Sequence, residues 1–136
     1  MTPRQRLPFP AAPRQVGAEM CTVFIVNEGR QLLVGRTSEA EGAQPFSCPL
    51  TSGLAGYVAV TGERLSLPDA QTDDRFNSEM DRKTGYRTRQ VLCLPIVSGA
   101  RVVGVCQCVN KRTGGDFTRE DEEMLNALSV VFSVRP

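Results

Sequence analysis

The sequence of 136 residues contains no histidine. Histidine is the most common general base and the usual partner that activates a serine or cysteine nucleophile, so these catalytic arrangements are excluded. It is also the commonest ligand of transition metals, so most catalytic metal centres are excluded as well. We therefore expect a chain that is not an enzyme and that has no metal site.

Cysteines are few, odd in number and without a CxxC pair, which makes a disulfide framework or a zinc site a poor interpretation. A reducing, cytoplasmic environment is expected instead. No apolar run approaches the roughly 18 residues of a membrane-spanning helix, and no secretory leader is visible. The net charge is only +1, so nothing favours nucleic acid as a partner. The five cysteines are Cys21, Cys48, Cys93, Cys106 and Cys108.

The length and the 40% share of hydrophobic residues suit one globular domain. Residues 1–17 hold four prolines and three arginines without any acid, so we expect a flexible tail there. Residues 18–136 are expected to form the folded domain.

Apolar patterning predicts strands at 21–27, 31–36, 64–67, 89–97 and 101–110 and helices at 51–61 and 118–134. Residues 37–48 are expected to be a loop, and the charged segment 69–87 a surface loop or short irregular helix. Short turns between strands favour antiparallel pairing, so we predict an α+β fold. On the strand at 101–110, Gln107 is expected on the same face as Val103, Val105 and Val109.

The chain's most informative stretch is the corner between the last strand and the last helix. Asn110-Lys111 ends the strand, Gly114-Gly115 turns the chain, and Thr118 is a good N-cap with Asp121 at the N3 position. A lysine at a strand end and a carboxylate in the first helical turn can meet as an ion pair. We therefore predict a structural ion pair between Lys111 and Asp121.

The segment from Asn110 to Glu122 resembles the signature of the cyclic-nucleotide-binding GAF domains of phosphodiesterases and some adenylyl cyclases. In it, Asn-Lys is followed after five residues by Phe, and Phe is followed after three residues by Asp-Glu. The resemblance runs from about Cys21 to Val134 and includes DRKTGYRTR at 81–89. It implies a GAF-like central antiparallel sheet of about six strands with helices on both faces. It also implies that the signature residues Asn110, Lys111, Phe117, Asp121 and Glu122 are structural.

The same resemblance implies which residues would meet a ligand. Leu54 and Ala55 would contribute backbone groups at a helix start, and Phe76-Asn77 would lie beside them. Ser38 and Gln107 stand where some cGMP-binding relatives have acids, which leaves the choice of purine open. A pocket lid would carry Asp81, Thr84 and Thr88, and the purine would meet Thr22, Thr37, Ser38 and Gln107.

The function expected from this resemblance is regulatory binding of a cyclic purine nucleotide, cGMP ahead of cAMP. The nucleotide would control an attached phosphodiesterase or cyclase catalytic domain, and a homodimer is possible. An alternative is a GAF module that has lost nucleotide binding and serves protein interaction or dimerisation. A third interpretation, a small-molecule sensor or a methionine-sulfoxide reductase, would need cysteines clustered around the pocket.

Overall fold

The computed structural model describes residues 16–37 and 45–133. Within them, six strands form one sheet in the order β3-β2-β1-β6-β5-β4, and each neighbouring pair is antiparallel. This confirms the expected α+β class and the antiparallel sheet. The strands are β1 (Ala18–Asn27), β2 (Leu32–Thr37), β3 (Phe46–Pro49), β4 (Leu65–Leu67), β5 (Val91–Ser98) and β6 (Arg101–Lys111).

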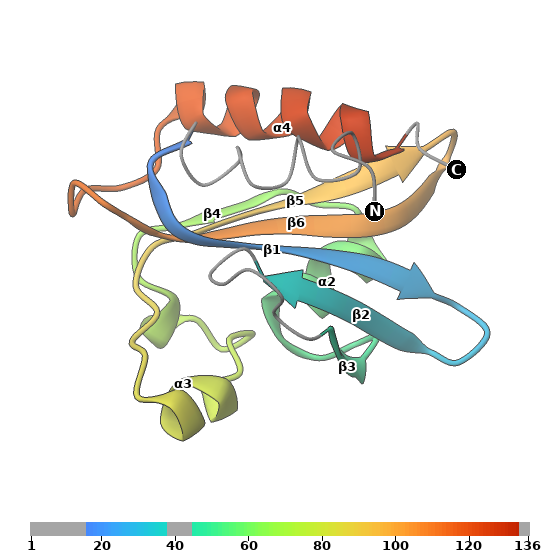
Figure 1. The fold of residues 1–136 in the computed structure, drawn as a ribbon, viewed down its shortest axis with the longest axis horizontal. Helices are drawn as coiled ribbons and strands as arrows, with labels where there is room; N and C mark the ends of the chain where they lie inside the picture. Colours follow the sequence, from blue (N-terminus) through green and yellow to red (C-terminus); the bar gives the residue numbers. More distant parts are fainter. Residues whose placement is uncertain (1–15, 38–44, 134–136) are drawn as a thin grey trace.

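Helices cover both faces of this sheet, as Figure 1 shows. The long helix α4 (Arg119–Ser133) packs along one face, mainly over β5 and β6, and α2 (Gly53–Thr61) packs on the other. The connection between β4 and β5 lies on the α2 side and contains a 3₁₀ turn, η2 (Ala70–Thr72), and the short helix α3 (Glu79–Thr84). No helix in the described part of the chain is both long and apolar enough to cross a membrane.

Each face of the sheet has its own apolar core, because side chains alternate along a strand. The α4 face buries Cys21, Leu92, Leu94, Cys106 and Leu125. The α2 face buries a second set that includes Phe24, Leu33, Val58, Val91 and Val105. The central strands β5 and β6 are buried on both sides, which explains why they contain long apolar runs rather than a simple alternation.

Two sequence-based expectations are wrong in detail. The last residues of the predicted loop 37–48 belong to the edge strand β3. This strand pairs with β2 and places Phe46 edge-on against Phe24. Val103 does not share a face with Gln107, because the β5–β6 register shifts between Ile96 and Val97, and Val103 packs on the α4 side.

The packed domain includes residues just before β1. Val16 is 1% exposed within the α4-face core, and the Gly17 carbonyl accepts a hydrogen bond from the Arg112 N–H at 2.8 Å. The rest of the expected tail, residues 1–15, lies outside the described residues.

Candidate functional site

A row of polar side chains crosses the α2 face of the sheet. In the strand register, Thr37 on β2 lies opposite Thr22 on β1, Thr22 lies opposite Gln107 on β6, and Gln107 lies opposite Cys93 on β5. Thr22 is 6% exposed, whereas Thr37 and Gln107 are half-buried. The structure thus brings together three of the four residues that the resemblance assigns to the purine. The fourth, Ser38, lies outside the described residues.

Cys93, at the end of this row, contacts Gln107 directly. The Cys93 thiol donates a hydrogen bond to Gln107 Oε1 with a sulfur–oxygen distance of 3.7 Å. Cys93 is fully buried, and burial raises its pKa well above the ordinary value for a thiol. The thiol therefore keeps its proton and acts as a donor. Sequence reasoning missed this contact, which depends on the β5–β6 register.

The start of α2 faces the segment that precedes α3. The side chains of Leu54 and Ala55 are buried in the core, so only their backbone groups are candidates for ligand contact. The first helical bond runs from the Gly56 N–H to the Ser52 carbonyl at 3.0 Å, so the N–H groups before Gly56 have no partner within the helix. Asn77 Nδ2 lies 3.4 Å from Ser52 Oγ, which places Asn77 beside the N-cap residue of α2.

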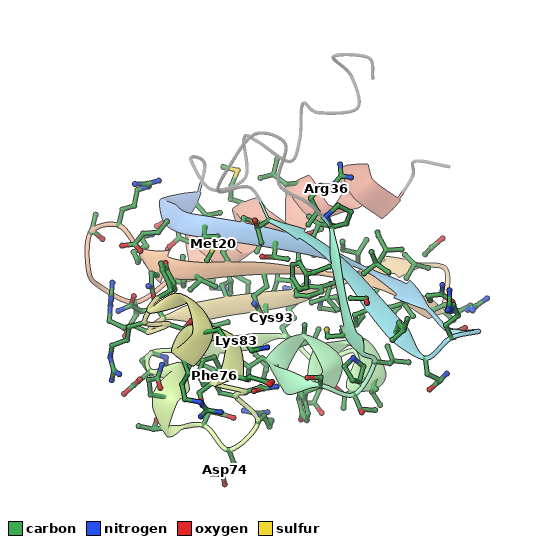
Figure 2. All side chains as sticks on the ribbon, turned by 60° about the horizontal axis from the view of Figure 1, so that its bottom comes forward. Met20, Arg36, Asp74, Phe76, Lys83 and Cys93 are labelled. Carbon is green, nitrogen blue, oxygen red and sulfur yellow. The ribbon has the colours of Figure 1, made fainter. Side chains whose placement is uncertain are left out.

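Phe76 and Asn77 have different surroundings. Phe76 is half-buried and packs against the α2-face core, and Figure 2 shows it on the same side of the sheet as Cys93. Asn77 is exposed, and its Oδ1 accepts a hydrogen bond from the Glu79 N–H at 3.0 Å at the start of α3. The Asn77 amide therefore holds the start of α3, and it has no ring on which a ligand could stack.

Asp81 anchors the segment 69–88, which we call the lid segment. Its two carboxylate oxygens accept hydrogen bonds from the Thr88 N–H at 2.8 Å and from Thr88 Oγ1 at 2.9 Å. Gln71 Nε2 donates both to Asp81 at 3.2 Å and to the Thr88 carbonyl at 2.8 Å. The structure therefore brings Asp81 and Thr88 together within the lid segment itself. Thr84 ends α3, and its side chain lies outside the described set.

Asn110 holds the C-terminal end of the lid segment to the sheet. It is 1% exposed and has φ +60°, a left-handed conformation that asparagine tolerates better than most residues. Its Oδ1 accepts a hydrogen bond from the Arg89 N–H at 2.6 Å, and its Nδ2 donates to the Arg87 carbonyl at 2.9 Å and to the Tyr86 hydroxyl at 3.0 Å. The only sequence signal for this role was an asparagine at a strand end.

Tyr86 extends this contact to the first strand. Its hydroxyl donates a hydrogen bond to Glu19 Oε1 at 2.7 Å. Burial and the neighbouring Glu19 carboxylate together raise the pKa of Tyr86 to about 12, so the phenol stays protonated at neutral pH. The end of the lid segment is thus hydrogen-bonded to both β1 and β6.

The predicted ion pair between Lys111 and Asp121 is present, and the two side chains are 15% and 14% exposed. The Lys111 ammonium also lies 5.7 Å from the centre of the Phe117 ring. Asp121 accepts a hydrogen bond from the Thr118 N–H at 2.8 Å, and Thr118 Oγ1 accepts one from the Asp121 N–H at 3.1 Å, which forms the predicted cap. Burial alone would raise the pKa of Asp121, but the bonds from Lys111 and Thr118 outweigh it and lower that pKa.

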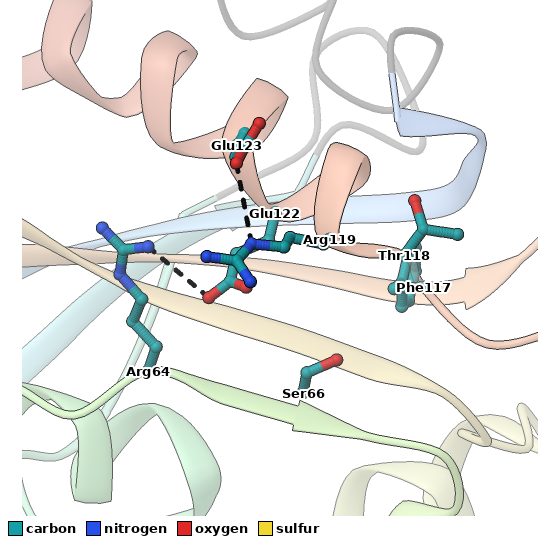
Figure 3. A pocket seen from close by; sticks show the side chains of 7 residues that line it. All are labelled: Arg64, Ser66, Phe117, Thr118, Arg119, Glu122 and Glu123. Atoms are coloured by element: carbon teal, nitrogen blue, oxygen red, sulfur yellow. Dashed lines mark ion pairs between the residues drawn. The ribbon is translucent and has the colours of Figure 1, made fainter.

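Two surface hollows lie away from the polar row. The first, of about 370 Å³, lies between the start of α4 and β4, where Glu122 pairs with Arg64 at 3.5 Å (Figure 3). The second, of about 530 Å³, lies beside the C-terminal end of α2 and the β5–β6 turn. Neither is lined by any of the predicted ligand residues.

Three cysteines cluster on the opposite face of the sheet. The sulfur of Cys21 lies 3.3 Å from that of Cys108 and 3.8 Å from that of Cys106, and all three are fully buried beneath α4. Hydrogen bonds with these two thiols, with burial, raise the pKa of Cys21 well above its ordinary value. These thiols are core residues of the α4 face and do not surround the polar row.

Comparison with known proteins supports the resemblance. The chain is 36% identical over 131 residues to the probable 3',5'-cyclic phosphodiesterase pde-5 of Caenorhabditis elegans, covering 88% of this chain and 18% of that protein. It is 36% identical over 124 residues to the dual 3',5'-cyclic-AMP and -GMP phosphodiesterase 11A of Takifugu rubripes, covering 81% of this chain and 14% of that one. The chain thus spans less than a fifth of the length of either relative.

Solved structures show the same fold. The GAF domain of a phosphoenolpyruvate-protein phosphotransferase from Coxiella burnetii superposes with a TM-score of 0.82 at 18% identity, covering 94% of this chain and 77% of that one. A free methionine-R-sulfoxide reductase from Neisseria meningitidis superposes with a TM-score of 0.71 at 15% identity, covering 92% and 71%. The family model described as "GAF domain" matches residues 11–135. This chain therefore belongs to the GAF domain family.

Proposed function

We propose that this domain is a non-catalytic regulatory module that binds a cyclic purine nucleotide, cGMP ahead of cAMP, and controls an attached phosphodiesterase or cyclase catalytic domain. The names of the two relatives support this proposal, since both describe enzymes that act on 3',5'-cyclic nucleotides. The absence of histidine from the sequence supports a regulatory rather than a hydrolytic part.

The observation that carries the proposal is the polar row Thr37–Thr22–Gln107 on an otherwise apolar sheet face. Half-buried polar groups in an apolar setting favour a polar ligand, because each needs a hydrogen-bond partner. A purine against this row would turn its cyclic phosphate towards the start of α2. The N–H groups of Leu54 and Ala55 and the positive end of the helix dipole favour an anion there.

The lid segment would supply the regulatory motion. The bonds from Thr88 and Gln71 to Asp81 hold the two ends of the segment together, so it would close over a bound nucleotide as one unit. A ligand transmits a signal only if it binds the open and closed forms with different affinity. Asn110 bonds the end of the lid segment, and the adjacent Lys111 bonds Asp121 at the start of α4. Closing of the lid segment would therefore be transmitted to α4 through two consecutive residues, Asn110 and Lys111.

Calorimetry with cGMP, cAMP and linear 5'-GMP tests the proposal, together with amide hydrogen exchange of the lid segment. We expect both cyclic nucleotides to bind, the linear nucleotide to bind much more weakly, and exchange at 69–88 to slow with ligand while β5 and β6 change little. Asp81→Ala should weaken binding roughly fivefold to a hundredfold, the factor for losing a polar anchor.

Asp74→Ala is the matched control, because Asp74 is exposed in the same segment and points away from the domain (Figure 2). It should bind like the wild type. The proposal fails if saturating cGMP and cAMP both leave exchange at 69–88 unchanged, or if Asp81→Ala and Asp74→Ala bind equally.

A second candidate function, protein interaction or dimerisation, is favoured by one exposed apolar pair. Ile25 and Val34 lie opposite each other on β1 and β2, and they are 55% and 36% exposed. They belong to the α4 face, but α4 packs mainly over β5 and β6. Sedimentation velocity tests this function: self-association that Ile25→Lys abolishes supports it, and a wild-type monomer at high concentration contradicts self-association.

A further inference from the structure

Resting on the nucleotide-binding function above, we propose that Cys93 is a positioning residue for purine selection. Its thiol fixes the carboxamide of Gln107 with the NH₂ group towards the nucleotide. The site then selects a purine that has an acceptor at position 6, guanine or hypoxanthine, over adenine.

The contact between the two residues is built into the sheet. Cys93 and Gln107 are direct cross-strand partners on β5 and β6, and their side chains meet with a sulfur–oxygen distance of 3.7 Å. Cys93 is fully buried, so its thiol has little freedom to exchange partners, whereas Gln107 is half-buried and is a member of the polar row. The contact therefore joins Cys93, whose side chain is held in the core, to Gln107, whose amide could otherwise turn either way.

The orientation of the amide follows from the strengths of donors and acceptors. A thiol is a weak donor and a weak acceptor, whereas an amide oxygen is a strong acceptor. An S–H···O=C contact is therefore better than an N–H···S contact in the same place. Because the buried thiol keeps its proton, Gln107 Oε1 stays directed at Cys93 and Nε2 stays available. The neighbouring Thr22 hydroxyl can donate or accept, so it adapts to either purine.

The edges of the two purines respond differently to a fixed NH₂ donor. Guanine presents two acceptors side by side, O6 and N7, whereas adenine presents the acceptor N7 beside the N6 amino donor. The favourable glutamine contact with adenine is bidentate and uses both the amide oxygen and the amide nitrogen. With its oxygen held by Cys93, Gln107 cannot accept from N6. Its NH₂ group matches O6 or N7 of guanine and of hypoxanthine.

The test compares dissociation constants of cGMP, cIMP and cAMP by calorimetry. Hypoxanthine lacks the 2-amino group of guanine but keeps O6 and N7, so wild type should bind cIMP within about threefold of cGMP and bind cAMP more weakly. Cys93→Ala should reduce the preference for cGMP over cAMP roughly three- to tenfold, which corresponds to one net hydrogen bond. Cys93→Ser should lower the preference by less than Cys93→Ala, because a hydroxyl can still donate to Gln107 Oε1 but can also accept from Nε2.

Cys108→Ala is the matched control, since Cys108 is equally buried but lies on the α4 face of β6. Cys108→Ala should lower stability about as much as Cys93→Ala does, and it should leave the preference for cGMP over cAMP unchanged. Cys93→Val gives an independent readout should Cys93→Ala not fold: valine fills a similar volume but has no donor, so the preference for cGMP should fall as in Cys93→Ala.

The results separate the two proposals. If wild type binds none of the three nucleotides, the proposed function itself fails. If it binds them but prefers cAMP, or if Cys93→Ala and Cys108→Ala keep the same preference, the positioning role of Cys93 is refuted while nucleotide binding stands. An unchanged preference in Cys93→Val refutes the role in the same way.

Discussion

Replacing Asn110 tests how the lid segment is held to the sheet. Asn110→Ala removes the partner of the Arg89 N–H and of the Arg87 carbonyl, and it leaves alanine at φ +60°. Asn110→Gly removes the same hydrogen bonds but has no penalty for a left-handed conformation. Comparison of the two variants therefore separates the hydrogen bonds from the backbone strain.

The expected magnitude follows from these contacts. An unsatisfied buried donor or acceptor costs about 1–3 kcal/mol, and an ordinary residue in the left-handed region costs about 1–2 kcal/mol. The side chains of Arg87 and Arg89 are exposed, so water can satisfy part of the lost bonding. We therefore expect Asn110→Ala to lower the free energy of unfolding by about 3–4 kcal/mol and Asn110→Gly by about 2–3 kcal/mol. These are large fractions of the roughly 5–15 kcal/mol of a typical domain.

Urea denaturation with linear extrapolation measures these differences. Gln31 supplies the control, because it has φ +55° in an exposed turn. Gln31→Gly should exceed Gln31→Ala in stability by about 1 kcal/mol, which reports the conformational penalty alone. The reasoning is refuted if Asn110→Ala lies within 0.5 kcal/mol of wild type, or if Asn110→Gly recovers wild-type stability.

Three further predictions concern the corner and the sheet. A double-mutant cycle of Lys111→Ala and Asp121→Ala should give a coupling of about 1–2 kcal/mol in urea denaturation, and zero coupling would contradict the ion pair. The folded pKa of Asp121 lies below the unfolded value of 3.8, so its contribution is present above about pH 4 and lost as the pH falls further; Asp121→Asn should flatten this acid dependence, and an unaltered slope would contradict it. Gly104→Ala should disrupt the sheet, because a Cβ would lie 2.5 Å from the Phe24 carbonyl oxygen, whereas Gly29→Ala should be tolerated; equal melting temperatures would contradict this.

Local patterns in the sequence predicted the elements that are long or strongly marked. The helix at 119–133 begins after the predicted cap Thr118, and Lys111 meets Asp121 across a turn of nine intervening residues. These features depend on residues close together in the chain, so spacing and side-chain chemistry are enough. Strand β3 was missed because four residues beside a loop carry little pattern, and its pairing with β2 is what makes it a strand.

By itself the sequence determined the α+β class, the capped corner and, through its resemblance, the family, because all three depend on local order along the chain. Only the tertiary structure decided the contacts of Asp81, Asn110 and Cys93, whose partners lie 7 to 91 residues away. Strand register decided that Cys93 faces Gln107, and a register shift turned Val103 to the opposite face. A side chain's face changes with a one-residue slip, so such contacts follow from the pairing of whole strands and cannot be deduced from the identity of one residue.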